Sequence, residues 1–191
     1  MVIKLKGDIM RYVLTILLLV MASQTYAQVK QAEVQITETL RALPEALRDG
    51  ATVIGYNQAG EQIELRKGTN DMICWADDPD LSNDKGKIYI VCFPKSLEPY
   101  MTRIRELRLN GVSNLYDSLA TEIELGIINM PKLAVRYTLR GHSHEGALPL
   151  TIIHVPYATS ESTGFSSEID NFRPWLMWEG TPHAHIMVPG H

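Results

Sequence analysis

The chain has 191 residues, a formal net charge of −4 and an apolar content of 45%. This length suits a single domain with a buried core. The acidic balance and the lack of a basic run argue against nucleic acid or an anionic membrane surface as the partner.

An N-terminal secretory signal peptide is predicted over residues 1–27. Basic residues open the chain, an apolar run follows over residues 12–22, and the small residue Ala27 precedes the expected cleavage point. The apolar run is shorter than the ~20 residues that span a bilayer, and no second long run follows. We therefore expect an exported protein, periplasmic or extracellular, without a membrane span after cleavage. A complete signal also follows Met10, which is an alternative start.

The rest of the chain, residues 28–191, is expected to form one α+β domain. It contains two cysteines, Cys74 and Cys92. An even number of cysteines in an oxidising compartment predicts a disulfide. A metal-binding thiolate pair and a redox couple are the alternatives, but the spacing does not fit C-x-x-C chemistry.

The first half of this domain combines one helix with two strand pairs. Helical spacing of leucines predicts a helix within residues 29–48, which ends before Gly50. Two β-prone runs, 52–56 and 62–66, flank a turn that contains Asn57 and Gly60 and read as a hairpin. Residues 72–75 and 87–93 predict a second strand pair, and the cysteines lie near the base of the polar loop between them.

Two amphipathic helices are expected in the middle of the chain. Ser96 and Ser113 are the predicted N-caps, because a serine hydroxyl can accept a hydrogen bond from an unpaired helix N–H. Gly111 and Gly126 mark the ends. The first helix places four apolar side chains on one face: Leu97, Met101, Ile104 and Leu107.

Strands resume after Pro131. Over residues 133–140 two sets of side chains alternate, and we read the segment as a half-exposed strand. The sets are Leu133, Val135, Tyr137 and Leu139, and Ala134, Arg136, Thr138 and Arg140. Further strands are expected at 150–157, 175–178 and 184–188. The elements together predict an α+β fold: an antiparallel sheet of about six to seven strands with two to three helices packed on one face.

Several short strings occur together in this chain. They are LRDGATV at 47–53, LRKGTN at 65–70, ESTG at 161–164, PWLM at 174–177 and AHIM at 184–187, along with the cysteine pair. In this set and order the chain resembles a family of uncharacterised secreted bacterial proteins. The resemblance covers most of the mature chain and implies export, but no reaction.

All six histidines lie in the last third of the chain: His142, His144, His154, His183, His185 and His191. In an H-x-H pair on a strand, both imidazoles face the same side. His183 and His185, with His154 from a neighbouring strand, are therefore candidate ligands for zinc or copper. Glu145 or Glu161 could add a carboxylate or act as acid/base. Ordinary hydrogen-bonded sheet histidines are the alternative.

Three weaker candidates complete the survey. Ser160, Ser162 and Thr163 could serve a hydrolase, although the sequence lacks G-x-S-x-G and S-x-x-K. The acidic loop at 77–84 could attract calcium, but it lacks the EF-hand pattern. Trp175 and Trp178 could form an aromatic platform for a ligand, and core packing is the alternative.

These observations predict an exported domain that binds a small ligand, a metal or an envelope protein. The alternative is a metal-dependent enzyme built on the C-terminal histidine cluster. Its catalytic residues are not defined by the sequence beyond the candidates above.

Overall fold

The computed structural model describes residues 29–81 and 87–190. The predicted signal peptide lies outside these residues. The helices are α2 (Ala32–Leu40), α3 (Glu45–Arg48), the 3-10 turn η1 (Lys95–Leu97), α4 (Glu98–Leu109), α5 (Leu115–Glu124) and α6 (Ser160–Thr163). The strands are β1 (Thr52–Tyr56), β2 (Gln62–Arg66), β3 (Met72–Trp75), β4 (Ile88–Pro94), β5 (Ala134–Gly141), β6 (Leu148–His154), β7 (Trp175–Met177) and β8 (His185–Pro189).

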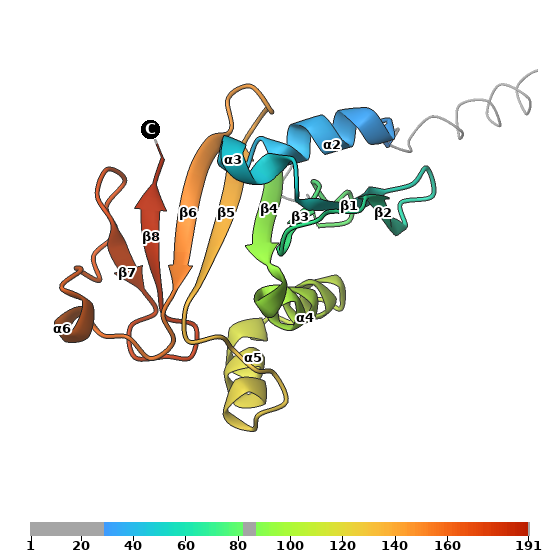
Figure 1. Cartoon of the computed structure of the whole chain (residues 1–191). Coiled ribbons are helices and arrows are strands. Elements are labelled where there is room, and N and C mark those ends of the chain that lie inside the picture. The colour runs from blue at the N-terminus through green and yellow to red at the C-terminus, as the bar shows by residue number, and fades with distance from the viewer. Residues whose placement is uncertain (1–28, 82–86, 191) are drawn as a thin grey trace, which may run out of the picture.

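All eight of these strands join one sheet in the order β2-β1-β3-β4-β5-β6-β8-β7 (Figure 1). Every neighbouring pair is antiparallel except β1 and β3, which run parallel. The fold is therefore α+β, as predicted, but the sheet is mixed rather than antiparallel. It has eight strands instead of six to seven, because the short β7 and β8 both pair into it.

Helices cover both faces of the sheet, so the prediction that they pack on one face is wrong. Strand β4 shows the reason, because its successive side chains enter two different cores. Val91 and Phe93 pack against α4 and α5, whereas Ile90 and Cys92 pack on the side of Leu43 and α2. In Figure 1, α2 and α3 lie near one end of β5 and α5 lies near the other. Five α-helices are present in the described residues instead of two to three.

Proline and local turns move several predicted boundaries. The helix expected within residues 29–48 is split, because Pro44 lacks the amide hydrogen that would continue it and stands at the N-cap of α3. Ser96 lies inside η1, and Leu97 is the N-cap of α4. Asn114 replaces Ser113 as the N-cap of α5. Neither predicted serine cap is used.

The predicted disulfide is present. Cys74 and Cys92 face each other across β3 and β4, with their Cα atoms 4.0 Å apart, and both are fully buried. The bond closes the polar loop between the two strands at its base. In the described part of the chain, no helix is long and apolar enough to cross a membrane.

The parallel pairing of β1 and β3 depends on a tight crossover. After β2 the chain returns past the start of β1, and Gly68 passes directly against the backbone of Gly50, Ala51 and Thr52. The amide of Gly68 donates to the Thr52 hydroxyl at 3.0 Å. A Cβ atom at Gly68 would sit closer to this backbone than real Cβ atoms approach, and backbone cannot move aside as a side chain can.

Gly68→Ala should therefore lower the free energy of unfolding by about 1–3 kcal/mol through overpacking. Gly146→Ala is the matched control, because its Cβ would meet only the Ser143 hydroxyl, at 3.3 Å. Urea denaturation of both variants measures the difference. Equal stabilities would contradict the close approach.

The double substitution Cys74→Ala/Cys92→Ala should reduce the free energy of unfolding by about 3 kcal/mol, because the unfolded chain regains the freedom of the closed loop. Urea denaturation of the variant and of the oxidised protein measures this loss. Alkylation with iodoacetamide under denaturing, non-reducing conditions checks the starting state. Two labelled cysteines in the untreated protein would show that the bond does not form.

Candidate functional site

The three histidines proposed as metal ligands lie in one buried cluster. His154, at the end of β6, lies directly opposite His185 on β8, and their ring centroids are 5.5 Å apart. His183 lies in the turn before β8 rather than on the strand, yet its ring reaches the same cluster. All three side chains are buried.

Both ring nitrogens of His183 already have protein partners. Nε2 lies 2.7 Å from the carbonyl oxygen of Tyr116. A carbonyl only accepts, so Nε2 carries the proton and donates. Nδ1 lies 3.1 Å from the Tyr100 hydroxyl and therefore accepts from it. Neutral His183 thus ties the turn before β8 to α4 and α5, and it has no lone pair left for a metal.

The other two histidines are arranged differently. His185 Nδ1 donates to the carbonyl oxygen of His183 at 2.7 Å. Both ring nitrogens of His154 are buried without a protein partner. In residues 29–81 and 87–190, no three His, Cys, Asp or Glu side chains are grouped so that they could hold a metal ion. The zinc or copper ion stays a prediction that this arrangement does not support.

Burial keeps the cluster neutral. It lowers the pKa of His154 to about 2, and the positive charge of Arg136 acts in the same direction. Burial also lowers the pKa of His185 to about 4 and the pKa of His183 below its ordinary value. A general base works best with a pKa near the working pH, so these imidazoles are poorly suited to that role at neutral pH.

The two tryptophans proposed as a ligand platform pack against the protein. Trp178 packs against Tyr116 in a tilted arrangement with ring centroids 4.2 Å apart, and its ring centroid lies 5.2 Å from that of His185. Its backbone φ of 57° lies in the left-handed region, which costs energy for a bulky residue. Trp175 is buried on β7, beside a hollow formed with the preceding loop.

The remaining predicted groups lie apart from the cluster. Glu145 and Glu161 are exposed, and neither forms a hydrogen bond or ion pair within the described residues. The Ser160 hydroxyl donates to Glu179, and the Ser162 hydroxyl accepts from the Thr159 amide as part of a capping box. Neither serine contacts a histidine.

Of the other histidines, His142 is exposed, His144 pairs with Glu38 at 3.1 Å, and His191 lies outside the described residues. The aspartates at the start of the acidic loop bind protein groups. Asp77 accepts from the Tyr89 amide, and Asp78 pairs with Arg105. Asn83 and Asp84 of that loop are not among the described residues.

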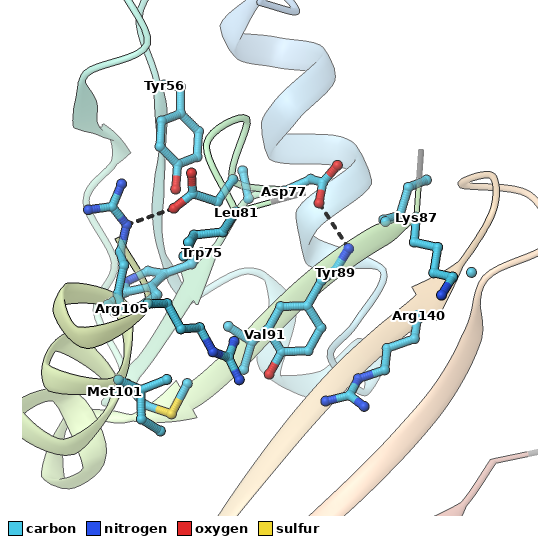
Figure 2. Close-up of a pocket in the computed structure, with 16 residues that line it drawn as sticks. Tyr56, Trp75, Asp77, Leu81, Lys87, Tyr89, Val91, Met101, Arg105 and Arg140 are labelled. Carbon is cyan, nitrogen blue, oxygen red and sulfur yellow. Dashed lines mark hydrogen bonds and ion pairs between the residues drawn. The ribbon is translucent and has the colours of Figure 1, made fainter. Parts of the chain in front are cut away.

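A cavity that we did not predict from the sequence lies between α4 and the face of strands β3, β4 and β5. Its volume is about 430 Å³. Figure 2 shows the Tyr89 ring at its centre, with Arg105 on one side and Arg140 on the other. Its apolar wall is formed by Trp75, Val91, Met101 and Ile104.

Positive charge dominates the polar wall. Four cationic residues line the cavity: Lys87, Arg105, Arg108 and Arg140. Only two carboxylates, Asp77 and Asp78, line it as well. The Asp78 carboxylate is taken by Arg105 at 2.7 Å. Arg108 contacts the Tyr116 hydroxyl, and Arg140 lies over the Tyr89 ring with its Cζ atom 4.7 Å from the centroid. Among the described residues, neither of these two guanidinium groups pairs with a carboxylate.

The charge around Tyr89 alters its acidity. Burial raises the pKa of the Tyr89 hydroxyl, but the guanidinium groups of Arg136, Arg140 and Arg108 outweigh burial and lower that pKa below its ordinary value. A phenol becomes more acidic only where negative charge is stabilised. The three guanidinium groups therefore make the surroundings of the Tyr89 hydroxyl electropositive.

The alternating pattern of β5 explains why sequence reasoning missed this cavity. We read this strand as half-exposed without deciding which alternating set is covered. The set that contains the two arginines also contains Ala134 and Thr138, and Ala134, Arg136 and Thr138 are buried. The only available signal was that Arg136 and Arg140 share one side of a strand, which is also common in exposed strands.

We compared the chain with protein-family models, curated proteins and solved structures and found no match. The fold and the cavity therefore define this protein only as an α+β domain with a cationic, partly apolar cavity.

The buried histidines predict a specific dependence of stability on pH. Their folded pKa values lie below the ordinary value of about 6.5, so the unfolded chain binds protons that the folded chain does not. The contribution of the neutral histidines to the free energy of unfolding is fully present above pH 6.5 and is lost as the pH falls toward 4. His154→Leu should reduce the number of protons taken up on unfolding between pH 6 and 5 by about one. The slope of the free energy of unfolding against pH should then change by about 1.4 kcal/mol per pH unit.

Urea denaturation at pH 7.5, 6 and 5 measures this slope. His142→Leu is the control, because the His142 side chain is exposed. An identical slope in wild type and His154→Leu would show that His154 titrates normally in the folded protein.

Proposed function

We propose that this protein is an exported domain that binds a small organic anion with an apolar body in the cavity between α4 and strands β3–β5. The observation that carries the proposal is the pair Arg108 and Arg140. Both guanidinium groups line the cavity without a carboxylate partner among the described residues, and Arg140 lies over the ring of Tyr89.

The positive charge in the cavity favours a ligand with negative charge. Hydrogen bonds between a guanidinium and an oxyanion are about twice as strong as those between neutral groups, because both partners are charged. In a half-buried cavity water screens these bonds less than at an open surface. A cation would meet the same groups with repulsion.

The apolar wall selects the rest of the ligand. Val91, Met101 and Ile104 present apolar contact surface, and Trp75 adds a large aromatic ring, so burying an aromatic or aliphatic body against them is favourable. A volume of about 430 Å³ is in the range of pockets that bind small molecules. A simple inorganic anion would leave most of this surface uncovered.

Of the three partners that the sequence suggested, this arrangement favours the small ligand over the metal and the envelope protein. A metal cation at His154 and His185 would face the unpaired charge of Arg136. Export rests on the N-terminal signal, on the resemblance to secreted bacterial proteins and on the Cys74–Cys92 disulfide, which suits an oxidising compartment.

Isothermal titration calorimetry with phenylacetate and 2-phenylethylamine tests which ligand charge the cavity binds, because the two compounds share an apolar body and carry opposite charges. We expect phenylacetate and phenyl phosphate to bind and the amine not to bind. Arg108→Met and Arg140→Met should each weaken anion binding tenfold or more, because each removes a charged hydrogen-bond donor.

Arg103→Met is the control on the same helix. Arg103 pairs with Glu122 and Glu106 and does not line the cavity that we propose as the site. Equal binding of the anions and the amine, or equal losses in Arg103→Met and Arg108→Met, would refute the proposed site.

A further inference from the structure

Arg136 is a buried cation that has no counter-ion within the described residues. It lies on β5 with 8% of its surface exposed, and its Nε has no hydrogen-bond partner. Its Nη1 donates to the thioether sulfur of Met101 at 3.3 Å, which is a weak acceptor. In the described residues Arg136 forms no ion pair. A buried guanidinium ordinarily has a carboxylate or several oxygen acceptors, because losing hydration costs several kcal/mol.

This guanidinium lies immediately behind the cavity. Met101, which it contacts, and Tyr89, which lies in its electrostatic field, both line the cavity wall. Arg136 and Arg140 lie on the same side of β5, because residues two or four apart on a strand share a face. The cationic wall thus continues inward from the exposed Arg140 to the buried Arg136.

A second buried group near Arg136 also lacks partners. His154, opposite Ala134 on the neighbouring strand β6, has both ring nitrogens buried and unbonded. Buried polar groups in folded proteins almost always have a hydrogen-bond partner. Among the described residues, Arg136 Nε and the two ring nitrogens of His154 have no hydrogen-bond partner, and a molecule bound in the cavity can supply one.

We propose that Arg136 is the deep anchor for the oxyanion of the ligand, and that the Met101 side chain covers this anchor until the ligand displaces it. This inference rests on the proposed function, since the ligand enters through the same cavity. It adds that the ligand carries a terminal carboxylate or phosphate at the end that enters first. Arg140 and Arg108 guide the acid group inward, and the apolar body remains against Trp75 and Ile104.

Met101 is suited to such a movement. Its side chain is unbranched and has three rotatable bonds, so it can change rotamer without moving α4. Its sulfur is the one acceptor that Arg136 uses within the described residues. An oxyanion is a far stronger acceptor, and the planar guanidinium can bind two of its oxygens at once.

Arg136→Met tests the anchor, because it keeps the apolar volume and removes the charge. We expect binding of phenyl phosphate and phenylacetate to weaken by about 30-fold or more, as for other buried charge pairs that lose one partner. Without ligand, the urea midpoint should stay unchanged or rise, because the uncompensated buried charge is gone. Arg103→Met serves as the control in both measurements.

Wild-type protein provides a second readout that does not depend on folding of the variant. In a ¹⁵N-labelled sample, the Arg136 Nε–H resonance, assigned by its loss in Arg136→Lys, should shift when phenyl phosphate or phenylacetate is added. A larger shift with one of the two distinguishes a phosphate ligand from a carboxylate.

The outcomes separate the two proposals. One outcome is unchanged anion binding in Arg136→Met together with an Arg136 Nε–H resonance of the wild type that does not shift when anion is added. This result would overturn Arg136 as the anchor, would indicate that Arg136 holds a bound water only, and would leave the cavity as a binding site. A clear drop of the urea midpoint in Arg136→Met with unchanged affinity would make Arg136 a structural residue. Absence of binding by both anions to wild type would overturn the proposed function and the anchor together.

Discussion

Strand β5 is covered on both faces, and this constraint shapes the rest of the structure. Its inner positions meet α4 on one side and the core beneath α2 and α3 on the other. Arg136 therefore occupies a position where a strand covered on both sides ordinarily carries an apolar side chain. The unpaired charge of this residue acts on the acidity of Tyr89, on the neutral state of His154 and His185, and on the contact with Met101.

The histidine cluster and the cavity lie on the same face of the sheet and have Arg136 between them. The cluster performs a structural task, because His183 bonds to Tyr100 of α4 and to the backbone of Tyr116 in α5. These bonds hold α4 against the sheet at the end nearer the histidines. The cavity lies farther along the same helix, where Arg105 and Arg108 line it. One helix thus contributes both to the rigid cluster and to the wall of the proposed binding site.

Stability and binding make opposite demands on this face. Apolar packing alone would give a more stable sheet, since a buried guanidinium without a partner is costly. Binding sites often retain such groups, because the ligand supplies what the chain lacks. The left-handed backbone at Trp178 and Tyr157, close to the histidine cluster, is a further local cost in the same region.

The sequence by itself determined the features that follow from the number of cysteines and from the local periodicity of apolar residues. With two cysteines only one pairing is possible, and periodicity located most strands and the apolar face of α4. Only the tertiary structure decided the parallel pairing of β1 and β3, the second helical layer and the burial of Arg136. Alternation along β5 reveals that the strand has two faces, but what covers each face is set by segments far away in the chain. Burial, hydrogen-bond partners and electrostatic environment all follow from that cover, so the cavity could be recognised only after the chain had folded.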